Sequence, residues 1–355
     1  MRVRWLALAA LLALSGCESL SYYAQAVGGQ LEMMHRAQPL ADWISDPATP
    51  PELRRRLELA ARIRGFASRE LALPENGSYR SYADLGRPYA VWNVFAAPEF
   101  SVKPVESCFP IAGCVAYRGF FAREGAEGYA ARKRAEGLDV FAYGVPAYST
   151  LGWFDDPLLS TFIHYPEWEL ARLIFHELAH QVVYVKGDTT FNESFAVTVQ
   201  DEGVRRWLES EGRGTELAAF REAETRKAEF VALIEHTRAR LARRYAEPLA
   251  PAAMRAAKGA EFARLAERYA GLKARWGGYT GFDRLMRDPN NALLASISAY
   301  ARLVPAFRRE LAAAHGDLAA FYSRVKALAR LPKAERDAAL SSDLSAQREI
   351  RSPTL

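Results

Sequence analysis

Two histidines and a glutamate occur at the spacing of an HExxH motif, in the pentapeptide HELAH at residues 176–180. Residues four apart lie about one turn apart on the same face of an α-helix, so His176 and His180 can bind one metal ion. Glu177 is rotated just enough to reach a water molecule beside that ion. The pattern is typical of zinc hydrolases, with two imidazole ligands and a carboxylate as general base.

The helix that carries this motif is expected to be buried. Apolar side chains cover nearly its whole circumference: Leu170, Leu173, Ile174, Phe175, Leu178, Val182 and Val183. A helix that is apolar all round packs inside a protein, and buried histidines need polar partners. The alternative interpretation is a pair of hydrogen-bonded core histidines. That alternative leaves Glu177 without a cation, and carboxylates are rarely buried alone.

A catalytic zinc ion needs a third protein ligand, and Glu193 is the candidate. Gly187 is expected to end the first helix, and Asn192 is expected to cap a second helix that begins at Glu193. The stretch from His180 to Gly187 covers about 10 Å of helix axis, which five extended residues can retrace. Glu193 can therefore return over the metal. The alternative is a carboxylate that is favoured in a first helical turn by the helix dipole alone.

Several segments resemble the bacterial predicted-aminopeptidase lipoprotein family. The run FHELAHQVVYVKGDTTFNESFA at residues 175–196 carries the HExxH motif and downstream glutamate by which this family belongs with the gluzincin metallopeptidases. The other similar segments are YYAQAVGGQL (22–31), VWNVFAAPEFS (91–101), CFPIAGCVAYRGFF (108–121), AYSTLGWFDDPLLST (147–161) and NNALLASISAYARLVPAF (290–307). The resemblance spans residues 17 to about 310. Ser107 departs from the family pattern, in which an aromatic residue is expected before the first cysteine. This difference affects local packing and not the chemistry of the site.

The resemblance implies a zincin-like fold of the α+β class, predominantly helical, with a small mixed sheet and a helical C-terminal part. It also implies one Zn²⁺ per chain and a peptide substrate cleaved by an aminopeptidase. Zinc held by His176, His180 and Glu193 would lower the pKa of its water toward ~7. Glu177 would take the proton and pass it to the leaving amine. No GxMEN-like sequence, which many gluzincin aminopeptidases use to hold the substrate amine, occurs in the chain, so the aminopeptidase activity rests on the resemblance.

Further site residues follow from the resemblance to zincin enzymes. A strand before the metal helix commonly pairs with the substrate, and the candidate is 147–154, with its substrate-binding part at Ala147, Tyr148, Ser149, Thr150, Leu151 and Gly152. The alternative is an ordinary sheet edge. Gluzincins often place a tyrosine from a later helix over the zinc, which makes Tyr300 the candidate oxyanion donor. The alternatives are a core or surface tyrosine at this position, and His164 or His236 as donors.

The N-terminus resembles a lipoprotein signal peptide. Arg2 and Arg4 precede a short apolar run, and Leu-Ser-Gly-Cys then ends at Cys17. About 20 apolar residues are needed to cross a bilayer, so the run of residues 5–14 indicates a cleaved signal of residues 1–16. Cys17 would then be lipidated and anchor the chain to the membrane. Because Glu18 rather than aspartate follows, we expect the periplasmic face of the outer membrane. The alternative is an ordinary signal peptide.

Two cysteines, Cys108 and Cys114, remain in the chain after Cys17. In an oxidising compartment they are expected to form a disulfide that closes a short loop. Metal binding by this pair is the alternative, but no second cysteine or nearby histidine completes such a site.

The charge of the chain argues against a nucleic-acid partner. The formal net charge of +5 falls to +3 when Arg2 and Arg4 are removed with the signal peptide, and it is spread along the chain. No basic block is interleaved with aromatic residues, so runs such as 54–56 indicate solvated helix faces. The sequence leaves the oligomeric state open.

The resemblance implies one metallopeptidase domain over residues 17–330, although a mature chain of about 340 residues could also hold two closely packed lobes. Its strand-containing part is expected at about 88–154, with strands at 89–95 and 139–145. Its helical part is expected at about 167–330. The predicted helices are 20–35, 51–72, 167–186, 193–211, 215–246, 251–275, 290–313 and 316–330. Residues 331–355 are polar and lack periodicity, which predicts a flexible tail.

Two other functional classes use the same residues differently. A metal hydrolase that does not cleave peptides could have the same site, and an endopeptidase could replace the aminopeptidase. A catalytically silent lipoprotein scaffold or chaperone is the non-enzyme alternative. Glu177 argues against it, because a structural metal site does not need a general base.

Overall fold

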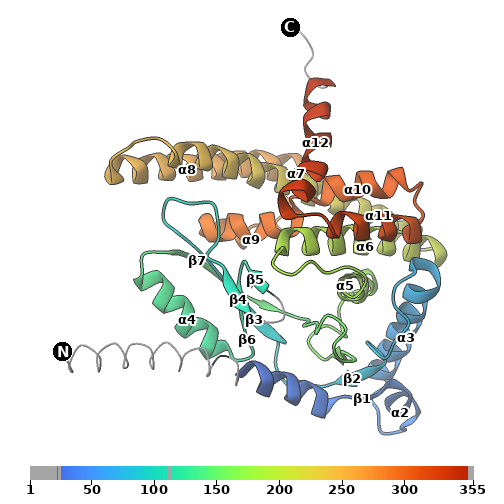
Figure 1. Cartoon of the computed structure of the whole chain (residues 1–355). Coiled ribbons are helices and arrows are strands. Elements are labelled where there is room, and N and C mark those ends of the chain that lie inside the picture. The colour runs from blue at the N-terminus through green and yellow to red at the C-terminus, as the bar shows by residue number, and fades with distance from the viewer. Residues whose placement is uncertain (1–21, 23–24, 110–112, 351–355) are drawn as a thin grey trace, which may run out of the picture.

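A computed structural model describes residue 22, residues 25–109 and residues 113–350, with side chains as far as residue 341. The predicted signal peptide and Cys17 lie outside these residues. The predicted α+β class with predominant helix is confirmed, and small sheets lie beside the helices (Figure 1). Among the described residues, no helix is both long and apolar enough to cross a membrane.

The elements have the following bounds. The helices are α2 (Leu40–Ser45), α3 (Pro51–Leu71), α4 (Arg123–Ala135), α5 (Glu167–His180), α6 (Thr189–Ser210), α7 (Gly214–Tyr245), α8 (Pro251–Arg275), α9 (Asn291–Ala301), α10 (Val304–Ala313), α11 (Leu318–Ala329) and α12 (Lys333–Ile350). Residues 25–36 are also helical. The strands are β1 (Gln38–Pro39), β2 (Ser81–Ala83), β3 (Val91–Ala97), β4 (Ser107–Phe109), β5 (Gly113–Val115), β6 (Arg118–Phe120), β7 (Asp139–Val145) and β8 (Leu158–Leu159).

The antiparallel sheet β6-β3-β7 lies between two helices. Successive side chains of a strand point to opposite faces, and β3 buries both faces. Val94 and Ala96 pack in the cluster that contains Ala126 and Tyr129 of α4. Phe95 and Ala97 pack with Ala292 and Ala299 of α9. The strand predicted at 139–145 is confirmed as β7, and that predicted at 89–95 is shifted by two residues.

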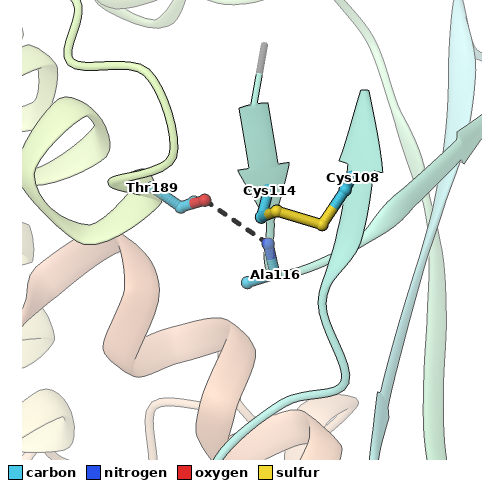
Figure 2. Close-up of a disulfide and its surroundings, with 4 residues drawn as sticks. All are labelled: Cys108, Cys114, Ala116 and Thr189. Atoms are coloured by element: carbon cyan, nitrogen blue, oxygen red, sulfur yellow. Dashed lines mark hydrogen bonds between the residues drawn. A yellow bond between two sulfur atoms is a disulfide. The ribbon is translucent and has the colours of Figure 1, made fainter. Parts of the chain in front are cut away.

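The β4–β5 hairpin carries the predicted disulfide, which is confirmed. Cys108 and Cys114 face each other across the two strands and form a disulfide bond (Figure 2). Just after β5, the backbone N–H of Ala116 donates to the hydroxyl of Thr189 at 3.4 Å, the first residue of α6. The hairpin is thereby tied to the helix that carries Glu193.

Helices α5 and α6 pack against each other in the centre of the main core (Figure 1). As the apolar circumference of the motif helix predicts, Ile174, Phe175 and Leu178 of α5 are fully buried. Phe195, on α6, lies in the same hydrophobic cluster. These contacts fix the two helices relative to each other, and with them the side chains of the HExxH motif and of Glu193.

The start of α6 differs from the prediction. The helix begins at Thr189 because the carboxylate of Asp188 accepts a hydrogen bond from the Phe191 N–H, so Asp188 is the N-cap. Asn192, the predicted cap, instead bonds the backbone of Val185 in both directions, at 2.7 and 2.8 Å. Glu193 therefore lies in the second turn of a helix that begins earlier than predicted.

Two C-terminal segments differ from the sequence prediction. The single helix expected at 290–313 is divided into α9 and α10, because Pro305 in the first turn of α10 has no N–H to continue the preceding helix. The flexible tail expected from residue 331 is helical up to residue 350. Arg336 donates to Asp188 at 2.8 Å, and Leu340 is buried. A partner 148 residues away in sequence thus orders a segment whose local pattern is only polar.

Candidate metal centre

The side chains of His176, His180 and Glu193 converge in the structure. Nε2 of His176 lies 3.2 Å from Oε2 of Glu193 and 3.2 Å from Nε2 of His180. Nε2 of His180 lies 3.6 Å from the same carboxylate oxygen. Among the described residues, these three form the one group of histidine, cysteine and acidic side chains close enough to hold a metal ion.

The donor atoms have the spacing that a tetrahedral zinc ion requires. Zinc bonds of 2.0–2.1 Å place neighbouring ligand atoms about 3.3 Å apart. The three separations, 3.2, 3.2 and 3.6 Å, are close to that value. The atom types also fit, because two imidazole nitrogens and one carboxylate oxygen are ligands that zinc prefers.

The electrostatics of the cluster also favour a cation. Burial alone would raise the pKa of Glu193, but the two imidazoles lower it to about 2. Burial alone would lower the pKa of His180, but the carboxylates of Glu193 and Glu177 raise it. Buried acceptor atoms that face one another repel unless a positive charge lies among them. The residues present therefore fit a divalent cation.

Gln200 of α6 orients one of the two imidazoles. Its side-chain N–H donates to Asp201 at 3.0 Å, and an ionised carboxylate can only accept. Burial opposes ionisation of Asp201, but Lys227 and Arg308 lower its pKa. The amide oxygen of Gln200 must then face Nδ1 of His176, 2.8 Å away. Nδ1 carries the hydrogen, and Nε2 presents its lone pair to the centre of the cluster.

The second histidine has no such partner. Nδ1 of His180 is buried without a hydrogen-bond partner among the described residues. Sequence reasoning missed Gln200, although a signal was present: it follows Glu193 by seven residues, about two helical turns. A polar side chain at that spacing on a buried helix lies on the same face as the ligand.

Glu177 lies beside the cluster without belonging to it. It lines the same cavity as the two histidines. Burial raises the pKa of Glu177, and the neighbouring imidazoles oppose this shift only in part. A carboxylate with a raised pKa close to the reacting groups is suited to accept and return a proton.

A cavity of about 910 Å³ opens from the three converging side chains. The strand predicted at 147–154 is wrong, because these residues form an irregular segment followed by a turn. The carboxylate of Asp156 holds this segment by accepting from the Thr150 N–H at 2.8 Å. Of the predicted substrate-binding residues, Ala147, Tyr148, Ser149, Thr150 and Leu151 line the cavity. Gly152 is not among the lining residues.

Three tyrosines of the cavity lining feel the charge of the Glu193 carboxylate. Tyr300, the predicted oxyanion donor, lines the cavity together with Tyr117 and Tyr184. Burial and the charge of Glu193 raise the pKa of each of them. Their hydroxyls therefore stay protonated and can donate a hydrogen bond. The sequence did not single out Tyr117, which follows the disulfide hairpin that is tied to α6.

The other histidines considered as donors lie elsewhere. His164 is exposed before α5 and is not among the residues that line the cavity. His236 lines a separate cavity formed by side chains of α7 and α8. Neither side chain is placed to act on a group bound at the candidate metal centre.

The lining of the large cavity contains few acidic groups. Within the described part of the chain, its acidic side chains are Glu177 and Glu193 alone. Its lysine and arginine are Lys227 and Arg172, which form ion pairs with Glu224 and Glu169. No further carboxylate among these lining residues is free to hold a substrate ammonium group.

Fold and site together define a predominantly helical α+β protein with a His–His–Glu cluster in the lining of a large cavity. The sequence profile of a family described as "Putative aminopeptidase" matches residues 21–340. The chain belongs to this family, and its membership indicates a peptidase. No curated protein and no solved structure matches the chain.

Proposed function

We propose that the protein is a zinc-dependent peptide hydrolase of the gluzincin type with a zincin-like fold. The observation that carries this proposal is the convergence of His176, His180 and Glu193 at separations of 3.2–3.6 Å, with Glu177 beside them. Family membership supports a peptide as the substrate. The lipid anchor at Cys17 and the periplasmic face of the outer membrane remain part of the proposal.

The roles of the side chains follow from their chemistry. His176, His180 and Glu193 would hold zinc, which when bound supplies a Lewis acid for the carbonyl and acidifies water. Glu177 accepts a proton from the attacking water and delivers it to the leaving amine. Tyr300 donates a hydrogen bond to the oxygen that becomes negatively charged. Gln200 holds His176 in the tautomer that leaves Nε2 free.

The direct test is hydrolysis of amino-acid anilides and of longer peptides by wild-type protein and by Glu177→Gln. We expect the variant to retain zinc and to lose activity by about 10²–10⁴-fold, the usual contribution of a general base. The matched control is Glu167→Gln, the same chemical change on the same helix, where the carboxylate pairs with Arg213 outside the cavity lining. Equal activity of wild type and Glu177→Gln would remove Glu177 from the mechanism.

Within peptidases, the family name favours an aminopeptidase. An endopeptidase is a second candidate, because the described cavity lining offers no third carboxylate for a free amine. Pairs of peptides that differ only in N-terminal acetylation separate the two activities. An aminopeptidase cleaves only the free form, whereas an endopeptidase cleaves both at similar rates.

A further inference from the structure

Exposed apolar side chains are concentrated at the cavity that contains the candidate metal centre. The described residues include seven large apolar side chains that are exposed, and five of them line this cavity. These five form what we call the apolar lip: Val27, Leu31, Met34, Trp153 and Phe154. The other two, Leu249 and Tyr279, lie beyond the ends of α8.

The lip comes from two segments that are far apart in sequence. Val27, Leu31 and Met34 are spaced by four and three residues on the helix of residues 25–36, which places them on one helical face. They are 58%, 59% and 37% exposed. Trp153 and Phe154, which are 68% and 49% exposed, lie in the turn that replaces the predicted strand. Exposure of this extent costs free energy unless a partner covers it.

The apolar surface continues from the lip toward the metal centre. Val91, Phe121, Val145 and Tyr148 line the same cavity, and Leu173 and Val197 of its lining lie on the metal-bearing helices. A charged side chain placed beside these apolar groups would lose hydration there. A large apolar side chain would instead be removed from water. A volume of about 910 Å³ is at the upper end of the range for ligand pockets.

We propose that this cavity selects peptides with large apolar side chains, which enter across the apolar lip. The proposal rests on the proposed function, because it makes the lip a substrate site of the same metal centre. A phospholipid membrane is the competing occupant of exposed apolar groups. The continuity of the lip with the lining that reaches His176 and Glu177 favours the peptide.

The test measures equilibrium binding of two hexapeptides to Glu177→Gln, in which cleavage is suppressed. One peptide contains leucine and phenylalanine at its four central positions, and the other contains serine there. We expect the apolar peptide to bind at least about tenfold more tightly, the discrimination that one or two methylene groups provide in an apolar pocket. Adding Leu31→Ser or Trp153→Ala should remove most of this preference.

Leu249→Ser in the same background is the matched control, because Leu249 is 40% exposed and outside the lining residues. It should leave the preference unchanged. Equal binding of both peptides would overturn the proposal. The proposal would also be overturned if the lip variants still bound the apolar peptide more tightly than the serine peptide, but bound phosphatidylcholine vesicles more weakly than the protein with an intact lip does. The lip would then be a membrane contact. Wild-type protein that binds the apolar peptide but hydrolyses no peptide would contradict the proposed function while leaving the binding preference established.

Discussion

Replacing Gln200 by alanine should weaken zinc binding without removing a metal ligand. In the wild type, the amide oxygen of Gln200 accepts from Nδ1 of His176 at 2.8 Å, and Gln200 is only 4% exposed. In the variant, the hydrogen is free to move to Nε2, and an Nε2–H cannot bind zinc. One buried hydrogen bond contributes about 0.5–1.5 kcal/mol. Since 1.4 kcal/mol corresponds to a factor of ten, we expect the zinc Kd to rise about tenfold, and at most about 100-fold.

The assay is competition for zinc between the purified protein and a chromophoric chelator. The matched control is Gln181→Ala. Gln181 directly follows His180 and makes side-chain hydrogen bonds to Asn76 and Ser78, so its loss removes a similar amide next to the motif. Gln181→Ala should leave the Kd within about twofold of wild type, inside the usual error of additive effects. A folded Gln200→Ala protein with wild-type zinc affinity would refute the role assigned to this side chain.

Three further predictions concern the catalytic donor, the disulfide and a buried carboxyl group. Tyr300→Phe should lower kcat by about 10²–10³ with little change in KM; a large loss in Tyr117→Phe and none in Tyr300→Phe would transfer the donor role to Tyr117. Thiol titration under denaturing conditions should gain two thiols from Cys108 and Cys114 on reduction, and the double serine variant should lose about 2 kcal/mol of unfolding free energy; finding both thiols before reduction would contradict the bond. Burial raises the pKa of Asp156 to about 6 from 3.8, so its contribution to stability is present at low pH and is lost as pH rises through about 6. In urea unfolding of the metal-free wild type, the free energy of unfolding should fall by up to about 3 kcal/mol from this group between pH 4 and pH 7, and Asp156→Asn should abolish that fall. Parallel dependence of the unfolding free energy on pH in variant and wild type would contradict the prediction.

The sequence predicted the centre of the molecule better than its edges. The HExxH spacing and the apolar circumference of α5 are local features, so they determine where His176 and His180 point once the helix forms. Glu193 reaches them as predicted, although α6 begins at Thr189 rather than at Glu193. The helix begins earlier because Asp188 caps it and is held in place by Arg336, while the side chain of Asn192 bonds the backbone of Val185.

Several features that depend on side-chain contacts were missed by the sequence analysis. The strand at 147–154 was expected from the resemblance to zincin enzymes, but the carboxylate of Asp156 accepts from the Thr150 N–H and holds the segment as an irregular loop. The polar sequence after residue 331 gives no sign of the buried pair between Arg336 and Asp188. Gln200 acquires its role only when α6 packs against α5, because its partner His176 lies 24 residues earlier in the chain.

The central claim is that His176, His180 and Glu193 hold one zinc ion. Its most direct test is metal analysis of the protein after dialysis against zinc and removal of unbound metal, together with X-ray absorption at the zinc edge. We predict one zinc ion per chain with two nitrogen ligands and at least one oxygen ligand, and loss of that zinc in His180→Ala and Glu193→Ala. Wild-type protein without zinc, or the same zinc content in both variants, would contradict the claim.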